Sequence, residues 1–260
     1  MTGIGLVIRS STADDHFVLA LVHALAEPLI ARGVGLFTRV VPDEAAEHAM
    51  YRHWAQSEGI SGVALLGGSP GDARTDLLRS LGIPFASVVD AQFASDAPAV
   101  VIDETASVKA IGDFLASRRH ARTVYLAGPP DSVTARSRAT AAADHFEVLH
   151  VDRSASAAAA AAVAVVAQGP ATLLFESDVH AAAAVSTLVE RGVRLPEDAA
   201  IVSWTDSSLC RSTTPSITAL NRRGSEIGTL LGRRMLAAIG GESPATDHAP
   251  EPYVVRRDSA

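Results

Sequence analysis

The segment Gly67-Gly68-Ser69-Pro70-Gly71 is the part of the sequence that most resembles a catalytic motif. It matches the Gly-x-Ser-x-Gly pattern of a nucleophile elbow, and it follows a predicted strand, as such a serine requires. In that elbow the residue after the serine donates its backbone N–H to the oxyanion, but Pro70 has no N–H. The segment therefore favours a tight turn that presents Ser69 to a ligand. An α/β hydrolase using Ser69 is the alternative.

The other residue types that could do chemistry do not predict a metal or cofactor site. The nine histidines lack His-Glu-x-x-His spacing and a carboxylate cluster that would complete a metal shell. Gly3-x-Gly5 begins a predicted strand instead of following one, so it is not a phosphate-binding loop. Cys210 is the only cysteine, which agrees with a reducing compartment. We expect no metal, no cofactor and no catalytic residue.

Polar residues gather where the predicted strands end. They are Ser10, Ser11, Ser69, Asp90, Arg138, Ser177, Asp178, Thr205 and Asp206. Most lie just beyond the carboxyl end of a strand, which is where open α/β sheets bind ligands. Residues of these types are also frequent helix caps, and for Ser10 and Asp178 a cap and a ligand contact are equally good explanations. No histidine accompanies them as a base, so the set suits binding better than catalysis.

Length and composition indicate a globular protein of two lobes. The 260 residues are 48% hydrophobic and 20% charged, and a single domain commonly has about 100 to 150 residues. No apolar run reaches the ~18 residues of a membrane span, and residues 1–9 lack the features of a secretory signal, so we expect a cytoplasmic protein. The net charge is −7 and the basic residues are scattered, so direct DNA binding by these residues is not expected.

Short apolar runs alternate with helical patterns, which predicts βα units around parallel sheets. A first series has strands at 4–9, 35–40, 62–66 and 85–89, with helices at 14–32, 42–58 and 74–81. After an extended segment at 99–102, a second series has helices at 105–118, 132–145, 156–168 and 179–191, with strands at 123–126, 147–151, 172–175 and 200–204. A helix at 225–239 and a strand at 253–257 follow both series. The alanine run 157–162 is an ordinary helix, since alanine is the strongest helix former.

The two series predict an α/β fold of two similar lobes, each a parallel sheet flanked by helices, with a ligand cleft between them. We assign residues 1–102 plus about 219–245 to the N-terminal lobe. Residues 103–218 plus about 246–260 form the C-terminal lobe. No Pro/Gly/Ser-rich linker separates the two series, so short crossing strands would join the lobes.

Five segments, in order, resemble the effector-binding core of the lactose/galactose repressor (LacI/GalR) family of transcription regulators. They are 126–138, 175–178, 192–198, 214–218 and 255–259. The resemblance covers essentially the whole chain and implies the periplasmic binding protein type I-like fold. It also implies a dimeric sensor for a sugar, sugar phosphate or sugar acid, which controls DNA binding allosterically by lobe closure. The family's helix-turn-helix headpiece has no counterpart here, so we expect no DNA-binding domain in these residues.

The resemblance also implies roles for single residues. Arg138 matches the arginine that clamps the effector in this family. Asp178 matches the acidic residue of the family's Asn-Asp pair, and Ser177 stands where asparagine is usual. Phe17 resembles the aromatic residue that stacks on a sugar ring. Ser10 and Asp90 lie at strand ends that line the same cleft.

Two departures from the family pattern concern the ligand. The family's Gly-Phe-Asp-Asp is Ser203-Trp204-Thr205-Asp206 here, so a threonine replaces an aspartate that often holds sugar hydroxyls. Trp204 and Asp206 are still expected to line the site. Arg153 stands where an aromatic residue can face the ligand, and together with Arg138 it favours an anionic effector. A solute-binding protein of a transporter is the alternative function, which the lack of a signal peptide disfavours.

Overall fold

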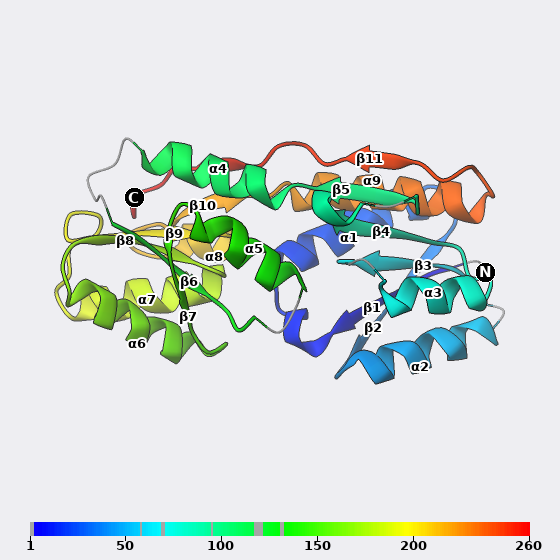
Figure 1. Cartoon of the computed structure of the whole chain (residues 1–260), viewed down its shortest axis with the longest axis horizontal. Helices are drawn as coiled ribbons and strands as arrows, with labels where there is room; N and C mark the ends of the chain where they lie inside the picture. Colours follow the sequence, from blue (N-terminus) through cyan, green and yellow to red (C-terminus); the bar gives the residue numbers. More distant parts are fainter. Residues whose placement is uncertain (1–2, 58, 69–70, 95, 117–121, 131–132) are drawn as a thin grey trace. The chain divides into compact units, whose positions relative to one another are not determined.

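The computed structural model describes residues 3–57, 59–68, 71–94, 96–116, 122–130 and 133–260. The chain forms two compact units (Figure 1). The first unit contains Met1–Asp103 and Arg223–Pro250, and the second contains Glu104–Arg222 and Glu251–Ala260. The chain therefore passes between the units three times.

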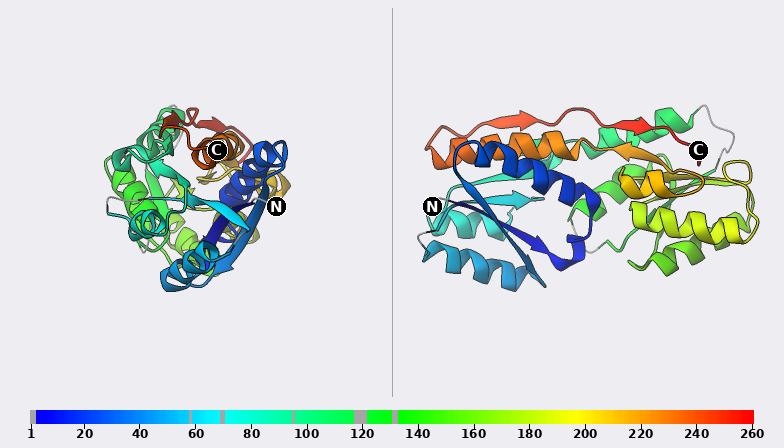
Figure 2. Two further views of the ribbon diagram at one scale, coloured as in Figure 1. Left: turned by 90° about the vertical axis from the view of Figure 1, so that its right-hand side faces the viewer. Right: turned by 180° about the vertical axis from the view of Figure 1, so that it is seen from behind.

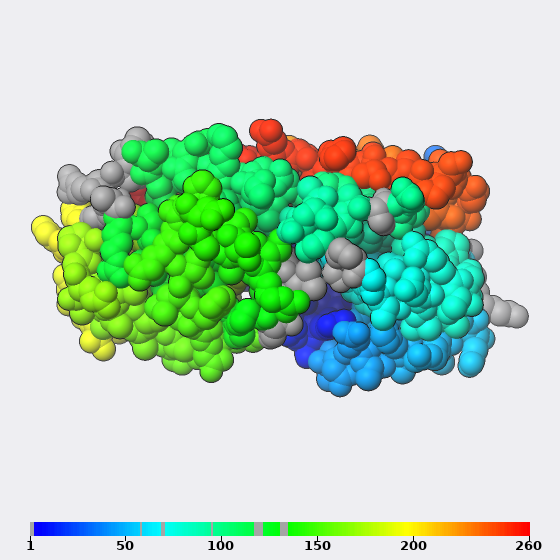
Figure 3. Space-filling view, viewed as in Figure 1, coloured from blue at the N-terminus to red at the C-terminus, as the bar shows by residue number. Residues whose placement is uncertain are grey.

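The first unit is a six-stranded, parallel sheet covered by helices on both faces, with the strand order β11-β5-β4-β3-β1-β2. Its strands are β1 (Gly3–Arg9), β2 (Gly35–Val41), β3 (Ile60–Leu66), β4 (Phe85–Asp90), β5 (Ala99–Ile102) and β11 (Thr246–His248). Helices α1 (His16–Ile30) and α9 (Gly224–Ile239) run side by side on one face (Figure 2). Helices α2 (Glu44–Ala55) and α3 (Ala73–Ser80) cover the other face and form the blue and cyan surface in Figure 3. The short 3-10 helices η1 (Ser10–Thr12) and η2 (Ala91–Phe93) follow β1 and β4.

Strand β1 shows why this sequence forms a two-sided sheet. A strand with helices on both faces must be apolar throughout, and β1 is buried from Gly3 to Ile8. Leu6 packs in the core beneath α1 and α9, whereas Val7 packs in the core beneath α2 and α3. The following helix begins where the Asp15 side chain accepts a hydrogen bond from the Phe17 N–H, a normal N-cap.

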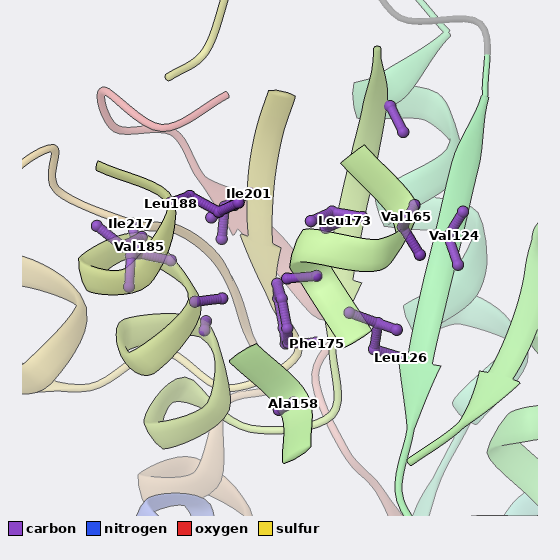
Figure 4. Packing of buried hydrophobic residues seen from close by; sticks show 14 of the residues in the cluster. Val124, Leu126, Ala158, Val165, Leu173, Phe175, Val185, Leu188, Ile201 and Ile217 are labelled. Atoms are coloured by element: carbon purple, nitrogen blue, oxygen red, sulfur yellow. The ribbon is translucent and has the colours of Figure 1, made fainter. Parts of the chain in front are cut away.

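The second unit repeats this plan with the strand order β12-β10-β9-β8-β6-β7, in which only β12 is antiparallel to its neighbour. Its strands are β6 (Thr123–Ala127), β7 (Glu147–His150), β8 (Ala171–Phe175), β9 (Ala199–Ser203), β10 (Thr218–Asn221) and β12 (Tyr253–Val255). Helices α4 (Glu104–Leu115) and α5 (Val133–Ala143) cover one face. Helices α6 (Ala155–Val166), α7 (Asp178–Glu190) and the short α8 (Ser208–Ser212) cover the other, where Leu173, Phe175 and Ile201 meet Val165 and Leu188 (Figure 4).

The predicted fold class is confirmed, and every predicted helix and strand is present within three residues at each end. The alanine-rich run lies in α6 as expected. The structure adds α8, β10 and β11, and β11 pairs with β5. Residues 246–250 therefore belong to the first unit instead of the second lobe, and the second crossing follows residue 222 instead of residue 218. No helix in the described part of the chain is long and apolar enough to cross a membrane.

Candidate ligand-binding site

Each sheet has a topological switch point, where neighbouring strands send the chain to opposite faces. In the first sheet β1 leads to α1 on one face and β3 leads to α3 on the other. In the second sheet β6 leads to α5 and β8 leads to α7 on opposite faces. Ligands of open α/β sheets bind outside the carboxyl ends of the strands at such points.

Arg138 lies at the switch point of the second sheet and is buried. Its Nη2 and Nε donate to Oε1 and Oε2 of Glu104 at 3.0 and 3.4 Å. Its Nη1 donates to Oε1 of Glu176 at 2.5 Å. The guanidinium lies over the ring of Trp204, with Cζ 4.9 Å from the ring centroid, in a cation–π contact. The arginine is thus held by two carboxylates and one aromatic face.

Arg222 and Tyr125 complete this arrangement. Nη2 of Arg222 donates to the same Glu104 Oε1 at 2.9 Å. The Tyr125 hydroxyl donates to Oε2 of Glu176, and the Tyr125 ring stacks on Trp204 with 5.3 Å between centroids. We call these residues the Arg138 cluster: Glu104 at the start of α4, Tyr125 in β6, Arg138 in α5, Glu176 after β8, Trp204 after β9 and Arg222 after β10.

The ionisation of the Arg138 cluster follows from burial and from the neighbouring charges. Burial alone would raise the pKa of Glu104, but Arg138 and Arg222 outweigh it and lower that pKa to about 2. Burial and the Glu176 carboxylate raise the pKa of Tyr125, so its hydroxyl stays protonated and donates. Burial would lower the pKa of Arg138, but Glu104 and Glu176 raise it. The charge of Arg138 is therefore compensated within the protein.

The first unit carries a second charged cluster at its own switch point. The buried Glu47 carboxylate accepts from Arg9 Nε at 2.8 Å, from the Tyr51 hydroxyl at 2.6 Å and from Arg74 Nη1 at 3.3 Å. Arg74 also pairs with Asp72, with 2.7 Å between Nη2 and Oδ2. It donates to the backbone oxygens of the last β3 residue and the next residue at 3.2 and 2.5 Å. These groups satisfy one another's hydrogen bonds and fix the chain at the end of β3.

The predicted site residues of the first unit lie on three separate segments. Ser10 is exposed at the start of η1, where Arg9 occupies the cap position, so Ser10 does not cap that helix. Phe17 is half-buried, with its ring against Gly224 of α9. Asp90 caps η2 by accepting a hydrogen bond from a backbone N–H two residues on. Ser69 lies outside the described residues.

Ser177 and Asp178 begin α7 in the second unit. The Ser177 side chain accepts from the His180 N–H at 3.3 Å and caps the helix. Asp178 is buried and accepts a hydrogen bond from the Ser207 hydroxyl, which links α7 to α8. Both residues therefore have structural roles at the carboxyl end of β8, next to Glu176.

Trp204, Asp206 and Arg153 occupy three different environments. Trp204 is fully buried, so it supports Arg138 from beneath and is not an exposed stacking surface. Asp206 forms an ion pair with Arg257, with 2.7 Å between Oδ1 and Nη2. Arg153 is exposed after β7, and its backbone oxygen bonds to Nε2 of His180 at 2.8 Å. Of the predicted site residues, only Arg138 and Trp204 belong to the Arg138 cluster.

Sequence reasoning missed Glu104, Tyr125, Glu176 and Arg222. Glu176 directly follows β8, so the same strand-end rule that selected Ser177 would have found it. Glu104 and Arg222 flank two of the crossings between units, a position that no local pattern marks. Among the described residues, no group of three or more His, Cys, Asp or Glu side chains is arranged to hold a metal ion.

Residues 113–260 match the periplasmic binding protein-like domain family. The chain belongs to this family. Among solved structures, it is similar to a LacI family transcriptional regulator from Bifidobacterium animalis subsp. lactis, with 26% identity and a TM-score of 0.88 over 99% of this chain and 97% of that one. A structure of the regulator CelR in complex with cellobiose has 22% identity and a TM-score of 0.83 over 99% of this chain and 84% of that one.

Curated relatives of the chain are also transcriptional regulators. An uncharacterised HTH-type transcriptional regulator from Streptomyces limosus is 28% identical over 238 residues, which cover 84% of this chain and 68% of that protein. The HTH-type regulator MalR of Streptomyces coelicolor is 25% identical over 221 residues, which cover 77% of this chain and 64% of that protein. The resemblance predicted from the sequence is thus confirmed: the chain corresponds to the effector-binding core of a LacI-type transcriptional regulator.

Proposed function

We propose that this core binds a sugar or sugar derivative against the Arg138 cluster and thereby regulates transcription in the cytoplasm. One observation carries the proposal: charged and aromatic side chains from separate elements converge on Arg138 at the switch point of the second sheet. Nη1 and Nη2 of Arg138 each keep one N–H with no partner among the described residues. The Glu176 side chain is 22% exposed, so a ligand there would meet the Glu176 carboxylate as an acceptor and the Arg138 guanidinium as a donor. We assign the chain no catalytic role.

Regulation would follow from unequal binding of the ligand to two conformational states. A ligand shifts an equilibrium only by its difference in affinity for the two states, typically about 1 to 3 kcal/mol for allosteric proteins. The relatives are HTH-type regulators, so the output would be the affinity of a helix-turn-helix segment for DNA.

The functional protein would be a homodimer that associates through the first unit. Three exposed apolar side chains lie on the α1 side of the sheet there: Leu19 and Ile30 on α1, and Val40 on the edge strand β2. Exposed apolar side chains that gather on neighbouring elements are typical of association surfaces.

Ligand binding can be tested by thermal unfolding with a panel of sugars. Cellobiose and maltose belong in it, because relatives include a regulator solved with cellobiose and a probable maltose operon repressor from Staphylococcus aureus. A ligand at 100 times its dissociation constant would add about 2.7 kcal/mol to the free energy of unfolding. Glucuronate, glucose 6-phosphate and a nucleobase complete the panel.

Arg138→Lys tests the site itself. Lysine keeps the positive charge between Glu104 and Glu176 but lacks the planar fork of donors, so we expect ligand affinity to fall about tenfold or more. Arg194→Lys is the matched control. Arg194 also binds a carboxylate through two nitrogens, Nε at 2.9 Å and Nη2 at 2.6 Å, but it precedes β9 and so lies near the amino end of that strand, away from Arg138. Equal affinity in both variants would contradict the proposed site.

A further inference from the structure

Glu176 is the most exposed ionisable side chain of the Arg138 cluster. Its side chain is 22% exposed, compared with 7% for Arg138, 2% for Glu104 and 7% for Arg222. The guanidinium groups lie deeper than this carboxylate. The cluster therefore presents a negative group, not a positive one, to whatever binds against it.

The charges of the Arg138 cluster are already balanced before any ligand binds. Glu104 bridges the two guanidinium groups, at 3.0 Å from Arg138 and 2.9 Å from Arg222. Glu176 pairs with Arg138 at 2.5 Å and accepts the Tyr125 hydroxyl through its other oxygen. Two arginines thus face two carboxyl groups. An anionic ligand at Arg138 would have to displace Glu176 from both of its partners, or bind beside it.

A hydroxyl group fits the same position without displacing anything. A hydroxyl is a donor and an acceptor at once. It can donate to Glu176 and accept from an N–H of Arg138 that has no partner among the described residues. A carboxylate has no proton to donate to Glu176. Phosphate keeps a proton at neutral pH but carries net negative charge, so the Glu176 carboxylate repels either anion even where Arg138 attracts it.

We propose that Glu176 determines the charge of the ligand: paired with Arg138, it admits an uncharged, polyhydroxylated compound and excludes sugar acids and sugar phosphates. The inference rests on the proposed function, because it names the class of ligand for the same site. The inference removes one of the two reasons for expecting an anionic effector, because Glu104 and Glu176 already balance the charge of Arg138.

Glu176→Gln tests this role with calorimetric titrations. The probes are cellobiose and maltose as neutral sugars, and glucuronate and inorganic phosphate as anions, at constant ionic strength. We expect wild type to prefer a neutral sugar to both anions. Glutamine keeps the shape of the side chain but leaves Arg138 partly uncompensated, so the dissociation constants for glucuronate and phosphate should fall by about tenfold or more, and that for the neutral sugar should rise.

Glu147→Gln is the matched control. Glu147 also binds an arginine through two bonds, from Nε and Nη2 of Arg122 at 3.0 and 3.2 Å. It is the first residue of β7, so it lies at the amino end of that strand, away from Arg138. This variant should bind all four probes as wild type does. Glu176→Ala provides a second variant if glutamine prevents folding, and the comparison of neutral and anionic probes on wild type needs no variant.

The outcomes separate this inference from the proposed function. Wild type that binds glucuronate or phosphate as tightly as any neutral sugar overturns the role of Glu176 but supports a ligand site. If no sugar binds wild type, the proposed function fails, and the phosphate titration still decides the inference. Equal phosphate affinity in wild type, Glu176→Gln and Glu147→Gln would overturn it.

Discussion

At the scale of single residues, Glu104 couples the stability of the fold to pH. It is ionised and fully buried between Arg138 and Arg222. Glu104→Gln would remove the negative charge that pairs with two buried guanidinium groups. Removing one partner of a buried ion pair typically costs about 3 to 5 kcal/mol. Urea unfolding at pH 7 should show this loss. The control Asp113→Asn, which breaks the exposed Lys109–Asp113 pair on the same helix, should cost less than about 1 kcal/mol.

The same measurement at lower pH checks the cause. The pKa of Glu104 is lowered from 4.5 to about 2 in the folded protein, so its stabilisation is complete above about pH 4.5 and is lost as the pH falls towards 2. The difference in unfolding free energy between wild type and Glu104→Gln should therefore shrink over this range, by an amount on the order of 3 kcal/mol. A difference that does not change with pH would show that Glu104 acts through packing alone.

Sequence reasoning reached Arg138 but not the residues that define its chemistry. Arg138 lies in a recognisable segment, and its resemblance to the family's clamping arginine identified it. Its partners Glu104 and Glu176 are 34 and 38 residues away along the chain, so no local spacing predicts the pairing. An arginine alone suggests an anionic ligand, whereas an arginine between two carboxylates does not.

At the scale of elements, α9 contacts α1 through glycines spaced four residues apart. A Cβ at Gly228 would lie 2.2 Å from the backbone oxygen of Leu21, and one at Gly232 would lie 2.4 Å from Cγ of Pro28. Gly228→Ala should destabilise the protein by about 1 to 3 kcal/mol, because the helices must move apart. Gly112→Ala on α4 is the control: a Cβ there meets nothing within 4 Å, so alanine should stabilise by up to about 1 kcal/mol. Thermal unfolding of the two variants would measure both effects. A Gly228→Ala variant as stable as wild type would show that the two helices can move apart at little cost.

Apolar patterns predicted the long elements because burial requires those patterns. Helix α1 buries Val18, Leu21 and Leu25, which lie three and four residues apart. Strand β11, with the sequence Thr-Asp-His, has no apolar residue, because an edge strand needs only its backbone to pair. That missing signal explains why residues 246–250 were assigned to the wrong unit.

At the scale of the whole molecule, association through α1 and β2 predicts that charge on this face prevents dimer formation. Ile30 is 68% exposed and Val40 is 59% exposed, and both would be buried in the proposed homodimer. A glutamate at either position would place an unpaired charge in an apolar contact. Ile30→Glu and Val40→Glu should therefore raise the dimer dissociation constant at least about tenfold in sedimentation-velocity experiments. Leu149→Glu, on the edge strand β7 of the second unit, should leave it unchanged. A dimer that survives both first-unit substitutions and is lost in Leu149→Glu would place the interface on the second unit instead.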